Sequence, residues 1–283
     1  MAKRSHPLLW GAALTGAALL LPGLDTTLRV RRYTVQTGRF ARPVRLAVAG
    51  DIHAGDYGEG QRRLISAIDR EAPDLLLIPG DLFDRRRDYR RVETLLRGLE
   101  GKYPAYYVTG NHEYCNSART LARNMAILKD HGVRRLSGEM APVTLRGQTF
   151  NLCGVDDPCA ARRFSDPGER GRKSFYRQLS RLAEQSKNGN YTVLLSHRPE
   201  QFPLYAACGF DLALCGHAHG GQWRIPGLLN GLYAPDQGLF PKYAGGEYRR
   251  RDTVMIVSRG LARDNTRVPR FYDPPELVTV DLI

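Results

Sequence analysis

The stretch LLLIPGDLFD, residues 75–84, decides the fold class. Five apolar residues run directly into a glycine and an aspartate, and a short apolar run bounded by glycine is typical of a buried strand. The same arrangement recurs at four other places: residues 44–49 before Gly50, 105–109 before Gly110, 191–195 before Ser196, and 212–215 before Gly216. The sequence therefore predicts five buried strands that each end at a polar loop.

Amphipathic segments fill the gaps between these strands. The apolar spacing predicts helices over residues 61–71, 88–99, 117–130 and 174–184, and further strands over 253–258 and 276–282. Alternating strands and helices favour an α/β fold, in which ligands bind where loops leave the carboxyl ends of the strands. No internal repeat or low-complexity linker divides the chain, so one compact domain is expected.

The five strand ends carry carboxylates, imidazoles and one amide. They read Asp51-x-His53, Gly80-Asp81-x-x-Asp84, Gly110-Asn111-His112-Glu113, His197, and Gly216-His217-x-His219. Mixed oxygen and nitrogen ligands without thiolate suit Mn²⁺, Fe²⁺, Zn²⁺ or Ni²⁺, and a single ion could not use them all. Each element alone is explained as well by a turn or a hydrogen-bonded loop histidine, but their agreement at five strand ends favours a site for two metals.

In this order the motifs resemble those of the calcineurin-like metallophosphoesterases: D-x-H, G-D-x-x-D, G-N-H-D/E, a lone H, and G-H-x-H. The resemblance implies a four-layer α/β/β/α sandwich with two central mixed β-sheets, over about residues 46–283. The stretch CGHAHGGQWRIP, residues 215–226, is similar to a subgroup of bacterial phosphodiesterases with an N-terminal membrane segment. That subgroup is similar to enzymes that hydrolyse UDP-2,3-diacylglucosamine.

The resemblance also implies a role for each motif residue. One ion would be held by Asp51, His53 and His219, the other by Asn111, His197 and His217, with Asp81 bridging both. His112 would lie near the phosphate as a catalytic residue, Glu113 would orient His112, and Asp84 would support the site. No substrate-binding residue is predicted.

The expected function is a dinuclear-metal-dependent phosphoester hydrolase, either a phosphodiesterase or a pyrophosphohydrolase. Two ions close together can hold a bridging hydroxide that attacks phosphorus, and they offset the charge on the phosphoryl oxygens. Two divalent ions per subunit are expected, with Mn²⁺ favoured over Fe²⁺, Zn²⁺ or Ni²⁺. A metal-dependent nuclease and a non-catalytic binding module are the alternatives.

Charge and the N-terminus bear on location and partners. The chain has 283 residues and a net charge of +13, which favours anionic partners. These would be a lipid-linked or nucleotide-linked phosphoester and an anionic membrane surface, with nucleic acid less favoured. The five cysteines form no CxxC pair and suggest a reducing compartment.

Residues 7–24 carry no charge, and arginines dominate the following stretch. We therefore expect an N-terminal hydrophobic membrane anchor or signal segment at residues 1–25, a basic juxtamembrane linker at 26–45, and the phosphoesterase domain at 46–283. The basic stretch predicts a membrane-associated protein whose catalytic domain faces the cytoplasm. An exported, cleaved form and a buried helix are the alternatives.

Overall fold

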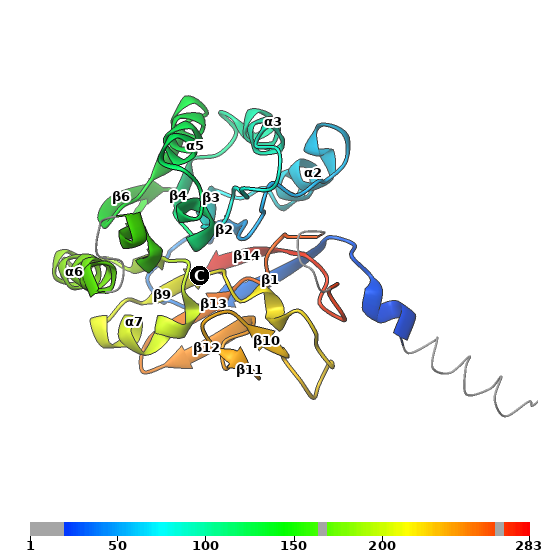
Figure 1. Cartoon of the computed structure of the whole chain (residues 1–283). Helices are drawn as coiled ribbons and strands as arrows, with labels where there is room; N and C mark the ends of the chain where they lie inside the picture. The colour runs from blue at the N-terminus through cyan, green and yellow to red at the C-terminus, as the bar shows by residue number, and fades with distance from the viewer. Residues whose placement is uncertain (1–19, 164–168, 264–268) are drawn as a thin grey trace, which may run out of the picture.

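Two six-stranded sheets form the centre of the protein in a computed structural model, which describes residues 20–163, 169–263 and 269–283 (Figure 1). The first sheet has the order β1 (Arg29–Val35), β14 (Glu276–Leu282), β2 (Val44–Val48), β3 (Leu75–Pro79), β4 (Ala105–Val108), β5 (Val133–Arg135). In this sheet β14 pairs antiparallel with β2, and every other pairing is parallel.

The second sheet has the order β12 (Gly246–Arg250), β13 (Thr253–Val257), β9 (Leu212–Cys215), β8 (Thr192–Leu195), β7 (Gln148–Gly154), β6 (Glu139–Leu145). Its two outer pairs are antiparallel and its central pairs are parallel. Both sheets are therefore mixed, and the predicted α/β class with two central sheets is confirmed.

Helices cover the outer face of each sheet. The first sheet carries α2 (Arg62–Glu71), α3 (Arg90–Leu99) and α5 (Ala118–Asp130), and the second carries α6 (Glu169–Gln185) and α7 (Phe202–Cys208) (Figure 1). Short segments complete the chain: η1 (Leu21–Leu24), η2 (Glu59–Gln61), α4 (Asn111–Tyr114), η3 (Pro158–Arg163), η4 (Pro199–Gln201), η5 (His219–Gly221), and the hairpin of β10 (Tyr233–Ala234) and β11 (Gly238–Leu239).

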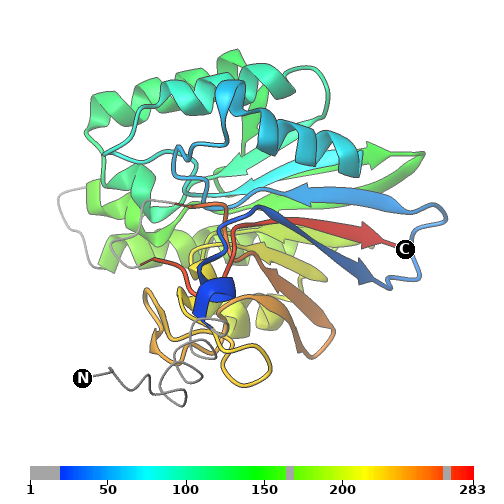
Figure 2. The same cartoon turned by 90° about the vertical axis from the view of Figure 1, so that its right-hand side faces the viewer.

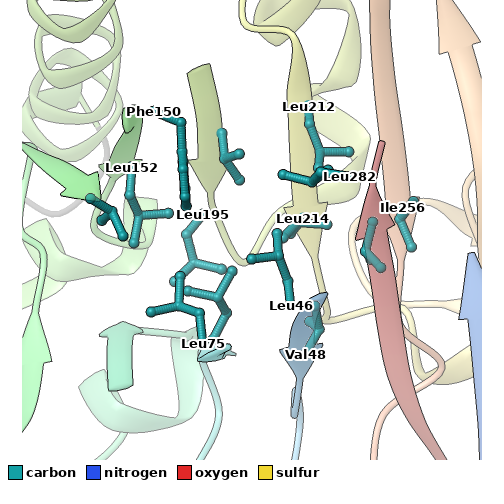
Figure 3. Packing of buried hydrophobic residues seen from close by; sticks show 14 of the residues in the cluster. Leu46, Val48, Leu75, Phe150, Leu152, Leu195, Leu212, Leu214, Ile256 and Leu282 are labelled. Carbon is teal, nitrogen blue, oxygen red and sulfur yellow. The ribbon is translucent and has the colours of Figure 1, made fainter. Parts of the chain in front are cut away.

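Alternation along the strands explains the four layers. Leu75 and Leu77 of β3 point into the core between the sheets, whereas Leu76 and Ile78 pack against the helices. Successive side chains of a strand face opposite sides, so a strand that is apolar on both sides needs a partner layer on each. Figure 3 shows the inter-sheet core, where Leu46 and Leu75 of one sheet meet Leu195 and Leu214 of the other.

The basic stretch 26–45, predicted to be a linker, contains a strand of the domain instead. Residues 29–35 form β1, which pairs parallel with β14 in a register that places Arg29 opposite Glu276 (Figure 2). Val30 and Tyr33 pack toward the two cores while Arg29 and Arg31 stay exposed. The arginines suit an edge strand, because charged side chains there discourage pairing with other chains.

The prediction of a membrane-associated location is wrong for the residues that the structure describes. Within 20–163, 169–263 and 269–283, no helix has the length and the apolar character needed to cross a bilayer. The predicted segment, residues 7–24, lies outside the described residues up to residue 19. Its described part is Leu20 and the four-residue η1 (Leu21–Leu24).

Candidate metal centre

The predicted ligands gather where five strands end. Asp51 follows β2, Asp81 follows β3, Asn111 opens α4 directly after β4, and His197 and His217 follow β8 and β9. β2, β3 and β4 are mutually parallel, as are β8 and β9, so the loops leave each sheet at its carboxyl edge. All seven predicted ligands then belong to two adjoining sets.

The first set contains Asp51, His53, Asp81 and His219, whose ligand atoms all lie within 4.8 Å of one another. His53 Nε2 is 3.4 Å from Asp81 Oδ2, and His219 Nε2 is 3.7 Å from Asp51 Oδ1. Two carboxylates and two imidazoles around one point form a site that a first-row divalent ion fits.

The second set is centred on His197 Nε2. This atom lies 3.3 Å from Asp81 Oδ2, 3.1 Å from Asn111 Oδ1 and 3.1 Å from His217 Nδ1. Asp81 Oδ2 therefore faces both sets.

Unpaired polar atoms show that these residues fit metal ions. In the described part of the chain, both ring nitrogens of buried His53 and Nδ1 of His219 have no hydrogen-bond partner. Asp51 and Asp81 are buried as well, at 0% and 1% exposure. Buried polar groups are almost always satisfied, so orphaned imidazoles beside two buried carboxylates indicate a cation site.

Burial and neighbouring charges control the protonation of these groups. Burial raises the pKa of Asp51, whereas the imidazoles of His197 and His53 outweigh burial at Asp81 and hold its pKa well below the usual value. Burial lowers the pKa of His217 to about 4 and also depresses that of His219. Both histidines are therefore neutral at pH 7, which is the form that binds metal.

The backbone of the ligand loops is held in a conformation that most residues avoid. Five ligands have left-handed φ angles: Asp51 at 51°, His53 at 50°, Asp81 at 50°, His217 at 69° and His219 at 47°. Such conformations cost on the order of 1 kcal/mol each in a non-glycine residue, and they cluster at functional sites. At His53 the conformation is fixed by a backbone hydrogen bond to the Asp81 carbonyl, 2.9 Å long.

Two of the predicted glycines allow loops to approach the carboxylates closely. A Cβ atom on Gly216 would lie 2.5 Å from Asp51 Oδ2, and one on Gly110 would collide with the Asp81 carboxylate. The reason for glycine here is close packing against the ligands, as the motif spacing suggested.

His112 lies at the rim of the metal centre. Its side chain is 38% exposed, and its ring centroid is 4.4 Å from that of His53. Nδ1 lies 3.2 Å from Asp84 Oδ2, while the His112 backbone N–H donates to Asp81 Oδ1. Burial lowers the pKa of His112, but the hydrogen bond to Asp84 and the charge of Asp81 outweigh it and raise the pKa above its usual value.

The role predicted for Glu113 belongs to Asp84. The Glu113 carboxylate accepts backbone N–H groups of Asp81, Phe83 and Gly110 at 2.7–3.1 Å, so it fixes the two loops rather than the His112 ring. Residues i and i+1 of a helical turn point about 100° apart, so Glu113 faces the interior while His112 faces the rim. Asp84, expected to be a supporting residue, orients His112 directly.

Sequence reasoning missed the residues behind His217. His217 Nε2 lies 2.9 Å from Asp236 Oδ2 and 2.9 Å from Arg198 Nη1, and Arg198 is itself paired with Asp157. Asp236 lies in the turn of the β10–β11 hairpin, outside every motif. When Nε2–H of His217 donates to Asp236, the lone pair of His217 Nδ1 faces the other residues of the second ligand set.

Comparisons with known proteins agree with this geometry. The Calcineurin-like phosphoesterase family profile matches residues 44–221. The uncharacterized metallophosphoesterase YkuE of Bacillus subtilis is 27% identical over 82% of this chain and 76% of its own length. Phosphodiesterase YaeI of Escherichia coli is 28% identical over 68% of this chain and 64% of its own.

The NAD nucleotidase of Haemophilus influenzae shares the fold, with a TM-score of 0.52 at 16% identity over 77% of this chain and 51% of that one. The chain spans less than two thirds of the length of YaeI and of several other curated relatives.

The chain belongs to the calcineurin-like phosphoesterase family, whose members use a dinuclear metal centre, and it is a phosphoester hydrolase with a cluster of residues that could bind metal.

Proposed function

We propose that the protein is a phosphodiesterase that uses two divalent ions, one in each ligand set. The observation that carries this proposal is the position of Asp81 Oδ2, 3.4 Å from His53 Nε2 and 3.3 Å from His197 Nε2. One oxygen that faces two separate imidazole sets is suited to joining two ions.

The chain's own residues would divide the work as follows. The two ions, when bound, supply Lewis acidity that activates water and offsets phosphoryl charge. Asp51, His53 and His219 hold one ion, and Asn111, His197 and His217 hold the other. Asp84 holds the Nδ1–H of His112, which leaves Nε2–H of the protonated ring free to donate to the departing oxygen.

The charges around the centre support a diester as substrate. A phosphomonoester carries two negative charges, and an additional free cationic side chain would stabilise it in the site. A diester carries one negative charge and needs such a side chain less. Arg198 contacts His217, but Asp157 and Asp236 already neutralise its guanidinium, and it is only 5% exposed. The name of YaeI, a phosphodiesterase, agrees with this proposal.

The test is hydrolysis of bis-p-nitrophenyl phosphate and p-nitrophenyl phosphate by the full chain, after chelation and after addition of Mn²⁺, Fe²⁺, Zn²⁺ or Ni²⁺. We expect activity only with metal and faster turnover of the diester. An Asp81→Asn variant purified in parallel controls for contaminating hydrolases. Faster monoester turnover would refute the diester preference, and equal activity of the variant would refute the assigned centre. Nucleotide-linked and lipid-linked diesters are the next substrates to assay.

A further inference from the structure

A cavity of about 500 Å³ lies apart from the metal centre, between β1 and α2. Figure 1 shows both elements on the same side of the molecule. Tyr57 and Arg263 also line the cavity, and none of the metal-centre residues lines it in the described part of the chain. A volume of this size falls within the range of small-molecule sites in proteins.

The cavity is strongly cationic. Four arginines line it, Arg62, Arg63, Arg70 and Arg263, and no described lining residue is acidic. The nearby acids have other partners: Asp25 pairs with Arg29, Glu71 with Arg32, and Asp69 with Lys102. Arg62 contacts Glu59 only at 3.9 Å and at the surface, where an ion pair contributes little.

Arg63 and Arg70 lie seven residues apart, two turns of α2, on the face that lines the cavity. Ser66 lies between them on the same face, and Thr26 and Thr27 add hydroxyl groups from the opposite wall. Guanidinium and hydroxyl groups together form the donor set that binds phosphoryl oxygens. Arg62 and Arg63 also add positive charge to the first turn of α2, where the helix dipole already favours an anion.

Arg263, from the segment after β13, adds a fourth guanidinium group to the cavity lining. Its Nε is buried and has no hydrogen-bond partner in the described part of the chain. The guanidinium lies over the Tyr57 ring, 5.8 Å from the centroid, and Nη1 donates to the Asp56 carbonyl at 3.4 Å. The guanidinium of half-buried Arg263 therefore retains N–H groups that a bound anion could accept.

The remaining lining is apolar: Leu28 and Val30 are partly exposed there, and Ala67 and Tyr57 are buried. An inorganic anion would satisfy the arginines and leave this apolar lining uncovered. We propose that the cavity is a second binding site, for a small molecule that joins a phosphoryl group to an apolar or aromatic group. A nucleotide and an alkyl phosphate share this chemistry.

Calorimetric titration of the metal-loaded full chain tests the proposal. The probes are α,β-methylene ADP, which resists hydrolysis between its phosphates, hexyl phosphate and inorganic phosphate. We expect both organic probes to bind more tightly than phosphate, and Arg63→Gln with Arg70→Gln to weaken that binding at least about tenfold. The organic probe that binds more tightly identifies the class of ligand, nucleotide or alkyl phosphate.

Matched variants separate this cavity from the metal centre. The double variant Arg97→Gln with Arg119→Gln removes two exposed helix arginines outside the cavity, and it should bind as the unaltered chain does. Asp81→Asn should weaken binding at the metal centre and leave the cavity isotherm intact. Equal binding by the Arg63/Arg70 variant, or inorganic phosphate binding as tightly as the organic probes, would overturn the proposal without affecting the phosphodiesterase assignment.

Discussion

Asp236→Ala should weaken the binding of one of the two ions and leave the binding of the other unchanged. Asp236 Oδ2 lies 2.9 Å from His217 Nε2, and Arg198 Nη1 lies at the same distance from that nitrogen. Without the carboxylate, Nε2 would accept from Arg198, and the proton of the neutral ring would move to Nδ1. Nδ1–H would then face His197, Asn111 and Asp81, where it cannot bind a cation.

The expected loss of metal affinity depends on how exposed the Asp236–His217 hydrogen bond is. Loss of a partner behind a metal-binding histidine typically weakens metal binding 10–100-fold, or about 1.4–2.7 kcal/mol. The Asp236 side chain is 55% exposed, so water screens its charge, and the lower end of that range, about tenfold, applies. The set formed by Asp51, His53 and His219 should keep its affinity, because Asp236 contacts none of these residues in the described structure.

Metal titration by calorimetry, with metal content measured by mass spectrometry, resolves the two binding events. Asp252→Asn is the matched control, because it removes one carboxylate from an exposed position away from the centre. Wild-type affinity for both ions in Asp236→Ala would refute the role assigned to Asp236. An equal loss of affinity for both ions would refute the separation into two ligand sets.

Three further changes separate chemistry from folding. His112→Ala should lower kcat about 10²–10⁴-fold while both ions stay bound, and a smaller loss in steady-state assays would remove His112 from proton transfer. Glu113→Gln should lower the free energy of unfolding by about 1–3 kcal/mol. The amide nitrogen cannot accept, so either the Phe83 N–H or the N–H groups of Asp81 and Gly110 lose their acceptor; urea denaturation measures this loss, and unchanged stability would contradict it. Removal of the ions by EDTA should lower Tm by several degrees, because metal at a concentration of 100 times Kd stabilises the folded state by about 2.7 kcal/mol. A thermal unfolding scan that EDTA leaves unchanged would contradict a structural contribution from the ions.

The strands that carry the centre were predictable because their signals are local. The bounds of β3 and β9 agree with the sequence to the residue, since each is a short apolar run that ends at glycine. β1 was missed because its arginines dominate its composition, and its apolar residues Val30, Tyr33 and Val35 follow no regular alternation. The pairing of β1 with β14 joins residues almost 250 positions apart, which no local pattern reports.

The sequence indicated that the candidate ligands lie together, but it did not indicate which residues contact them from behind. Motif order placed Asp51, Asp81 and His217 at strand ends, and parallel pairing brings such ends together. The partner of His112 depends on side-chain direction after a left-handed turn, so spacing could not distinguish Asp84 from Glu113. Asp236 reaches His217 only through the position of a hairpin, which follows from tertiary packing.

The central claim is that Asp81 joins two ion sites, and the metal content of the purified chain tests it most directly. The unaltered protein, reconstituted with Mn²⁺ and freed of excess metal, should hold two ions per chain. Asp81→Asn should hold one or none with its fold preserved, as judged by circular dichroism. A single ion in the unaltered chain, or two ions retained at wild-type affinity in Asp81→Asn, would contradict the account.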